Sequence, residues 1–136
     1  MKVVIDTNVL LKSIPRVSSF RPIFDAILSR RLVVAVSVDI LHEYLEVVER
    51  ETSLEVAQNL HQLLLSKPNV LLTTVHYRWG LITADLDDNK FVDCAIAASA
   101  DFVVTDDKHF SVLAAVEFPT VKVASSREFL KQVLSS

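Results

Sequence analysis

Short, continuously apolar segments recur along the chain and alternate with longer segments in which apolar residues are spaced as on one face of a helix. The first two apolar segments show no alternation with polar residues, which is typical of strands covered on both faces of a parallel sheet. Later apolar segments have a similar aliphatic composition. Strands are therefore predicted at residues 3–5, 32–36, 70–72, 102–104 and 121–123.

Between the predicted strands, apolar residues repeat with helical spacing and capping residues mark where helices begin. Pro22 suits the first turn of a helix, because the missing N–H has no hydrogen bond to lose there. Residues 52–55 and 125–128 have the capping-box pattern, in which a hydroxyl and a carboxylate each accept from a backbone N–H. Helices are predicted at about 7–13, 19–31, 39–51, 52–66, 90–100, 109–114 and 125–134.

Strands that alternate with helices predict an α/β fold with a parallel sheet covered on both faces. We expect a three-layer α/β/α sandwich with a central parallel sheet of four to five strands. The chain has 136 residues, which is enough to bury one core. Residues 1–136 are therefore expected to form a single domain. Within it, residues 76–89 have the least regular pattern and are predicted to form a long loop.

The composition argues against several classes of protein. No apolar run approaches the roughly 18 residues of a membrane span, and the N-terminal apolar run ends at Asp6 rather than at a cleavage site. The single cysteine cannot form an internal disulfide, so a reducing cytoplasm is expected. The single glycine, Gly80, leaves no Gly-rich phosphate loop. A net charge of −3 argues against a protein that coats nucleic acid, but not against a nuclease with clustered acids.

Acidic residues follow the predicted strands or begin the adjoining helices. In open α/β sheets, ligands bind beyond the carboxyl ends of the strands. Asp6 ends the first strand, and taken alone it is explained slightly better as a cap of the next helix. If the first and fourth strands are neighbours, acids from three segments converge on one edge. The other acids near this edge are Glu43, Asp85, Asp87, Asp88, Asp93, Asp106 and Asp107.

Crowded carboxylates have a chemical consequence. They repel one another and raise one another's pKa, so that a divalent cation is the main way to stabilise them at neutral pH. An acid cluster without cysteines or paired histidines suits Mg²⁺ or Mn²⁺ rather than Zn²⁺, and Mg²⁺ takes phosphate oxygens among its ligands. A bound metal ion can activate water and stabilise a leaving oxygen. The expected reaction is hydrolysis of phosphodiester bonds.

Four motifs, in order and spacing, resemble those of the PIN-domain ribonucleases, metal-dependent nucleases that include the VapC-type toxins of toxin–antitoxin systems. The resemblance covers essentially the whole chain and implies a PIN-like fold. The last two motifs are similar to those of a toxin-component subgroup of the family. The motifs are VIDTNV at 4–9, SVDILHEY at 37–44, DLDDNKFVDCA at 85–95 and VTDDKHF at 104–110.

The resemblance also implies which residues form the metal site. In the family's last motif the acid lies two residues after the threonine, which selects Asp107 over Asp106. Asp88 is a further candidate metal ligand, because it and the acid five residues later can both approach the site from the helix start. Asn8 and Thr105 are expected to orient a carboxylate or a water molecule. The implied catalytic acids and metal ligands are Asp6, Glu43, Asp93 and Asp107.

The main hypothesis is an endoribonuclease that depends on Mg²⁺ or Mn²⁺ and hydrolyses RNA. In the family, a toxin role implies a cognate antitoxin protein, and homodimers are common; no membrane partner is expected. An alternative is a catalytically silent PIN module that binds RNA or a protein. A phosphatase with Asp6 as covalent nucleophile ranks last, because phosphatases resembling the haloacid dehalogenases have a second Asp where this chain has Asn8.

Few other residues point to contacts with RNA. His109 follows Lys108 and is expected to be solvated rather than bound to a phosphate. Trp79 is expected to anchor its loop rather than to stack on a base. The basic residues that best suit a phosphate-binding rim are Lys12, Arg16, Arg21 and Lys90.

Overall fold

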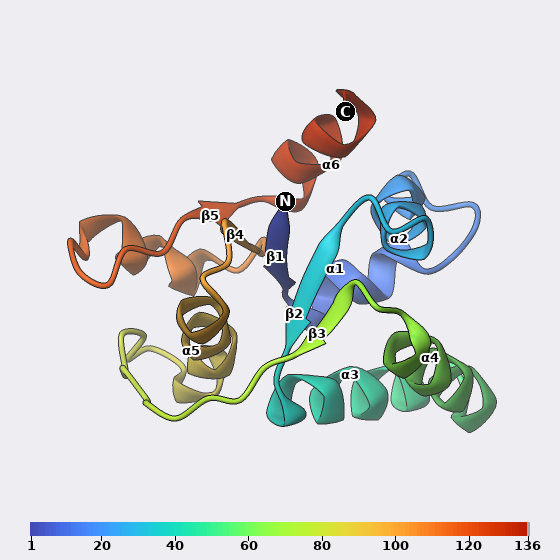
Figure 1. Ribbon diagram of the computed structural model, residues 1–136, viewed down its shortest axis with the longest axis horizontal. Coiled ribbons are helices and arrows are strands. Elements are labelled where there is room, and N and C mark those ends of the chain that lie inside the picture. Colours follow the sequence, from blue (N-terminus) through green and yellow to red (C-terminus); the bar gives the residue numbers. More distant parts are fainter. Residues whose placement is uncertain (136) are drawn as a thin grey trace.

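Five strands form one parallel sheet with helices around it in the computed structural model, which describes residues 1–135 (Figure 1). The strands are β1 (Lys2–Ile5), β2 (Val33–Val36), β3 (Val70–Leu72), β4 (Phe102–Val104) and β5 (Val123–Ala124). The α-helices are α1 (Thr7–Ser13), α2 (Arg21–Leu28), α3 (Val38–Glu51), α4 (Leu54–Ser66), α5 (Asn89–Ala98) and α6 (Ser126–Ser135). Two 3₁₀ helices are η1 (Leu86–Asp88) and η2 (Lys108–Ala115). The predicted α/β fold with a parallel sheet is confirmed.

The order of the strands places β1 at the centre of the sheet. The order is β3-β2-β1-β4-β5, and every neighbouring pair is parallel. The chain builds β2 and β3 on one side of β1 and then returns to the other side for β4 and β5. In Figure 1, α5 lies on one side of the strands, and α1 and α2 lie on the other. The direction of building therefore reverses between β1 and β4, the kind of position where open sheets bind ligands.

Packing fixes the carboxyl end of β1. Val3, Val4 and Ile5 are fully buried, and burying a side chain of this kind stabilises the fold by about 1.5–3 kcal/mol. At the end of the strand, the hydroxyl of the buried Tyr44 on α3 donates a hydrogen bond to the carbonyl of Ile5. The residue that follows Ile5 therefore leaves the sheet from a rigid position.

Caps begin several of the helices, although one predicted capping box is wrong. Ser125 and Glu128 form the predicted box at α6, where each side chain accepts from the other residue's backbone N–H at 3.1 Å. At α4, Ser53 rather than Thr52 is the cap, and its hydroxyl accepts from the Val56 N–H. The Thr52 hydroxyl donates instead to the carbonyl of Val48 at the end of α3. Thr52 therefore ends one helix instead of beginning the next.

Differences from the predicted elements lie mainly at element ends. The loop before η1 covers residues 73–85, and β5 lies at Val123–Ala124 rather than at 121–123. β3 is an edge strand whose Leu72 is 61% exposed, because no further strand pairs with it in the described sheet. Among residues 1–135, no helix is long and apolar enough to cross a membrane.

The side chain of Asn69, just before β3, links α2 to the residue that precedes β2. Its loss is expected to destabilise the protein. Its buried amide nitrogen donates to the carbonyls of Ile27 and Leu32 at 2.9 and 2.7 Å. Asn69→Ala leaves both carbonyls without this donor, at a cost of about 2–3 kcal/mol in the free energy of unfolding. Urea unfolding measures the change. The exposed Asn59→Ala on α4 is the control, and equal losses in the two variants would contradict this account.

Candidate metal centre between β1 and β4

Asp6 lies at the carboxyl end of β1, where the sheet continues for one more hydrogen bond. Its backbone N–H donates to the carbonyl of Val104 at 2.9 Å. Within the described chain its side chain forms no capping hydrogen bond with α1, so the cap explanation of Asp6 is not supported. Instead, a carboxylate oxygen accepts from the hydroxyl of Thr105 at 2.6 Å. The side chain of Asp6 is thereby directed across to the end of β4.

Thr105 and Asp107 extend this arrangement beyond β4. The buried Thr105 hydroxyl, which donates to Asp6, accepts from the backbone N–H of Asp107 at 3.0 Å. Asp107 in turn caps η2 by accepting from the His109 N–H at 2.8 Å. Asp106 has different partners. Its carboxylate accepts hydrogen bonds from the ammonium of Lys12 and from the backbone N–H and the hydroxyl of Ser126. The geometry therefore agrees with the choice of Asp107 over Asp106.

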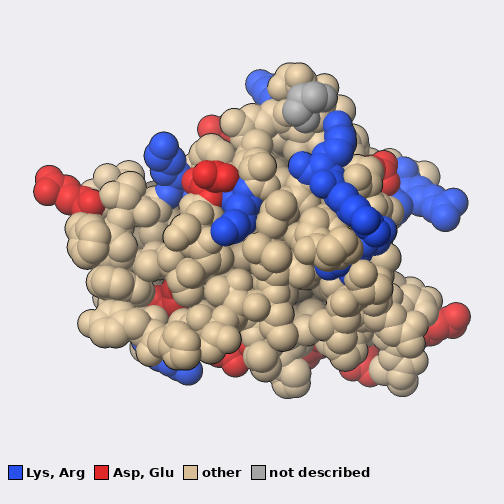
Figure 2. All heavy atoms as spheres, viewed as in Figure 1, with Lys and Arg blue, Asp and Glu red and all other residues tan. Residues whose placement is uncertain are grey.

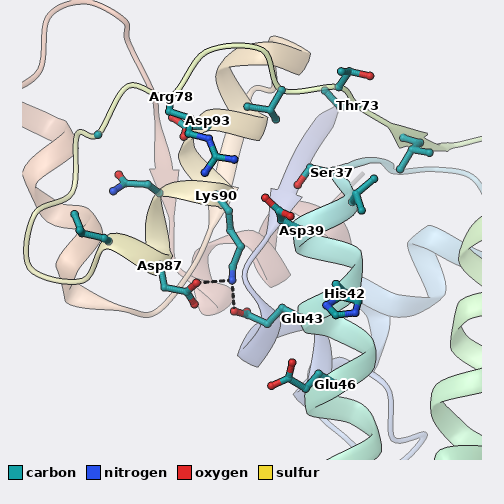
Figure 3. A pocket seen from close by; sticks show the side chains of 17 residues that line it. Ser37, Asp39, His42, Glu43, Glu46, Thr73, Arg78, Asp87, Lys90 and Asp93 are labelled. Carbon is teal, nitrogen blue, oxygen red and sulfur yellow. Dashed lines mark hydrogen bonds and ion pairs between the residues drawn. The ribbon is translucent and has the colours of Figure 1, made fainter.

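Glu43 reaches the same edge from α3, and both of its carboxylate oxygens are engaged. One oxygen accepts from the hydroxyl of the buried Thr7, and the other pairs with the ammonium of Lys90 at 2.6 Å. Lys90 also binds Asp87 at 2.9 Å (Figure 3). Burial alone would lower the pKa of Lys90, but the bonds to Glu43 and Asp87 outweigh it and raise the pKa. Lys90 thus neutralises acids of this protein, and the predicted phosphate rim at this position is not supported.

Asp88 comes to the site from η1, directly before α5. Its side chain is 14% exposed. Burial and the charges of Asp107, Asp85 and Asp6 raise the pKa of Asp88 to about 6, against the opposing effect of a hydrogen bond with His109. Burial also raises the pKa of Asp6, against the Thr105 hydrogen bond, and the charges of Glu43 and Asp107 add to the rise. The two shifts show that acids from four segments lie within electrostatic reach of one another.

Asp93 does not lie with this group. One carboxylate oxygen accepts from the backbone N–H of Trp79 at 3.0 Å. Burial raises the pKa of Asp93, and the Trp79 N–H and the positive charge of Arg78 oppose the rise. In Figure 3, Asp93 and Arg78 lie at one end of a pocket, and Glu43 lies farther along it. The structure therefore places Asp93 where it anchors the loop of residues 73–85.

The supporting residues also differ in part from those predicted. Thr105 contacts Asp6 as expected, whereas Asn8 is exposed on α1. The residue of α1 that contacts an acid is Thr7, whose hydroxyl donates to Glu43. Asn89 was not predicted to have a role. Its buried side chain makes hydrogen bonds to both the N–H and the carbonyl of Ile82, and so closes the loop onto α5.

A pocket of about 820 Å³ adjoins the Glu43 side of the site, between α3, the 73–85 loop and α5. Charges of both signs line it (Figure 3). The charged residues that line the pocket include Glu43, Asp87, Lys90, Asp93 and Arg78. The pocket is large enough for a nucleotide-sized group, and it opens beside the acids rather than at a distance from them.

The donor set fits a hard divalent cation. Asp6, Asp88 and Asp107 offer only carboxylate oxygens, the ligand type that Mg²⁺ and Mn²⁺ prefer. Burial and the neighbouring acids raise the pKa of Asp6 and of Asp88, so both carboxylates are costly to keep charged without a further cation. A divalent cation would balance them, and the described residues therefore fit such an ion.

With this geometry described, comparison with known proteins identifies the family. A PIN domain family model matches residues 2–109, and the chain belongs to the PIN domain family. The fold is similar to a chain in the crystal structure of VapBC2 from Rickettsia felis bound to a DNA fragment from their promoter, with a TM-score of 0.61 and 18% sequence identity. That match covers 92% of this chain and 98% of the other. No curated protein sequence matches the chain. The predicted family is confirmed, and the predicted fold with it.

The raised pKa of Asp88 predicts how stability depends on pH when metal is removed. Because the pKa rises from 3.8 to about 6, the folded protein binds more protons than the unfolded chain between these values. The contribution of Asp88 to stability therefore falls as pH rises through this window. In EDTA at pH 7, Asp88→Asn should be more stable than the wild type by on the order of 1 kcal/mol, allowing for solvent screening.

Urea unfolding at pH 7 and at about pH 4 measures this effect. Most of the advantage of Asp88→Asn should be lost at the lower pH, where the wild-type carboxyl is protonated in the folded state and about half protonated in the unfolded chain. Asp25→Asn, on the exposed face of α2, is the control and should show no comparable gain. Equal stability of the wild type and Asp88→Asn at pH 7 would contradict the crowding of acids at this site.

Proposed function

We propose that this chain is a single PIN domain, residues 1–136, that acts as an endoribonuclease dependent on Mg²⁺ or Mn²⁺. The observation that supports this most is the convergence of Asp6, Asp88 and Asp107 at the point where the strand order reverses, with the pKa of Asp6 and of Asp88 raised by burial and, to a lesser extent, by the neighbouring acids. Membership of the PIN domain family supports the same activity. RNA as the substrate rests on the resemblance of the motifs.

Different neighbouring residues hold Asp6 and Glu43 in position. Asp6, Asp88, Asp107 and Glu43 would hold the metal ion, which when bound supplies an activated water and stabilises the leaving oxygen. Thr105 keeps Asp6 directed towards Asp107. Thr7 and Lys90 fix the two oxygens of Glu43. The described residues thus hold the acids in place before any ligand arrives, and this preorganisation favours catalysis.

We assign Asp93 a different role from the one implied by the family resemblance. Its bond to the Trp79 N–H fixes the 73–85 loop, and Arg78 in that loop lines the pocket next to Glu43. Arg78 is therefore the basic side chain that we place on an RNA phosphate. Asp93 acts through the loop, and its place among the metal ligands stays a prediction that the experiment below decides.

The net charge of −3 supports a mode of binding in which the site itself supplies much of the affinity for RNA. In the view of Figure 2, lysine and arginine side chains gather over the α2 and α6 region, and large areas carry no charged side chain. The net charge of −3 agrees with this distribution. A divalent cation at the acids would then supply much of the attraction for phosphate.

We propose that the protein is the toxin of a toxin–antitoxin pair in the cytoplasm, with a cognate antitoxin protein and a second copy of the chain as partners. The similar fold in VapBC2, which that structure shows bound to promoter DNA, supports an antitoxin partner. The alternative of a catalytically silent module is favoured by one observation: Lys90 already neutralises Glu43 without a metal ion. Binding of Mn²⁺ separates the two proposals.

Replacing Asp6 tests the proposed site. Asp6→Asn keeps the size of the side chain but removes the charge, so cleavage of a defined single-stranded RNA with Mn²⁺ should fall by on the order of 10³-fold. Binding of Mn²⁺, measured by calorimetry, should weaken in parallel. Asp25→Asn is the matched control and should retain both. Full cleavage by Asp6→Asn, or by the wild type in excess EDTA, would exclude the proposal.

Asp93→Asn distinguishes an anchoring residue from a metal ligand. If Asp93 anchors the loop, Mn²⁺ affinity should stay within about twofold of the wild type, while the KM for RNA rises as Arg78 loses its position. An Arg78→Gln variant should show the same rise in KM. A loss of Mn²⁺ binding in Asp93→Asn comparable to that in Asp6→Asn would restore Asp93 to the ligands.

A further inference from the structure

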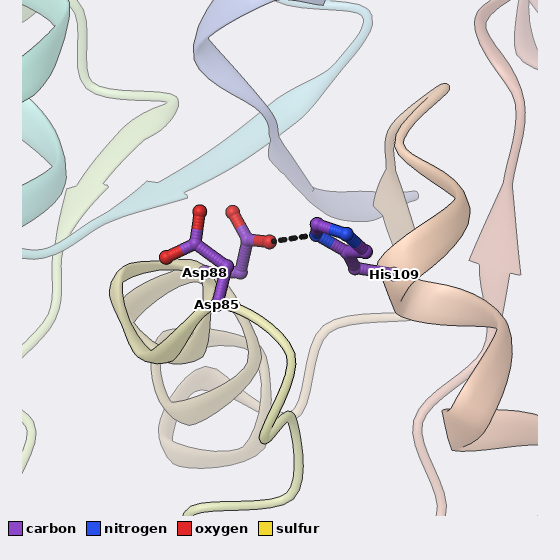
Figure 4. A group of neighbouring side chains, drawn as sticks. All are labelled: Asp85, Asp88 and His109. Carbon is purple, nitrogen blue, oxygen red and sulfur yellow. Dashed lines mark hydrogen bonds and ion pairs between the residues drawn. The ribbon is translucent and has the colours of Figure 1, made fainter.

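The His109 side chain, although 39% exposed, lies close to two of the acids. Its Nδ1 atom is 3.3 Å from a carboxylate oxygen of Asp88 and 3.4 Å from one of Asp107. The backbone N–H of the same residue donates to Asp107 at 2.8 Å, which fixes the start of η2 beside the acids. In Figure 4 the imidazole ring faces Asp88 across the gap between η1 and η2. His109 is therefore partly solvated, as predicted, but it also contacts two acids of the site.

The spacing of these atoms suits a shared cation. Neighbouring ligands of an octahedral Mg²⁺-sized ion, bound at about 2.1 Å, lie about 3 Å apart. The two contacts of Nδ1 are close to this separation and longer than the 2.6–2.9 Å of the Lys90 and Lys12 ion pairs. Donor atoms of Asp85, Asp88 and His109 all lie within 4.8 Å of one another. One cation can therefore contact an imidazole nitrogen together with carboxylate oxygens after small shifts.

We propose that His109 is a nitrogen ligand of the metal centre, and that it makes the centre selective for Mn²⁺ over Mg²⁺. Carboxylates alone accept either ion, whereas imidazole binds the divalent transition metals more strongly than Mg²⁺. The inference rests on the proposed metal-dependent function and adds the identity of the ion. It includes the exposed Asp85, whose carboxylate lies within 4.8 Å of donor atoms of Asp88 and His109.

The test uses the wild-type chain and Mn²⁺ alone. Electron spin-echo envelope modulation of bound Mn²⁺ detects a coordinated ¹⁴N nucleus directly, and the wild type should show this coupling. His109→Gln should lose the coupling, and its Mn²⁺ affinity by calorimetry should fall about tenfold while its Mg²⁺ affinity changes less than about threefold. His61→Gln, on α4, is the matched control and should keep the wild-type spectrum and affinities.

A second variant separates the loss of the ligand from a loss of structure. His109→Asp replaces the nitrogen by an oxygen donor, so Mg²⁺ binding should match or exceed that of the wild type while the preference for Mn²⁺ disappears. Bound Mn²⁺ without ¹⁴N coupling in the wild type, or coupling that persists in His109→Gln, would overturn the role of His109 and leave a metal-dependent nuclease intact. Absence of Mn²⁺ binding by the wild type would overturn both proposals.

Discussion

The pairing of β1 with β4 is the constraint on which the rest of the site depends. The strands are parallel, with Ile5 opposite Val104, and the hydrogen bond from the Asp6 N–H to Val104 continues this pairing to the first residue outside the sheet. Successive side chains of a strand point to opposite faces, so a slip of one residue would turn Asp6 away from Thr105. The full burial of Val3, Val4 and Ile5 prevents such a slip, because it would move the flanking Lys2 or Asp6 into a buried apolar position. The hydrophobic pattern of the strand therefore also sets the position of a functional carboxylate.

The charges around this point are balanced unevenly. On the side of α3 and α5, Lys90 neutralises Glu43 and Asp87. On the side of β4 and η1, Asp88 lies near other acids, and its pKa is raised to about 6. Repulsion of this kind opposes folding, and active sites often retain it because the same unbalanced charge attracts a ligand. The structure thus separates a part of the site that is self-neutralised from a part that is suited to a cation.

The sequence predicts those features that depend on one segment at a time. The strands follow from apolar runs, and Asp6 follows from its place directly after a strand, whereas Asp107 is chosen over Asp106 through the resemblance of its motif. The sequence could not tell whether Asp88 or Asp93 lies nearer to Asp6. The two are five residues apart, and the direction in which each side chain points depends on where α5 begins. Five residues turn a helix by about 500°, so the two side chains project in directions roughly 140° apart. The partners of Lys90 and His109 come from other segments, and a single sequence without its fold gives no signal of such pairings.

The long separation along the chain between the two halves of the site has a consequence for protein synthesis. Thr105 and Asp6, which share a hydrogen bond, are 99 residues apart. Chains emerge N-terminal end first at about 5–20 residues per second. A nascent chain that has released β1, β2 and β3 but not β4 contains Asp6 and Glu43 without Thr105 and Asp107. Under the proposed ribonuclease function, the order of the strands would therefore delay activity until β4 and Asp107 have emerged from the ribosome.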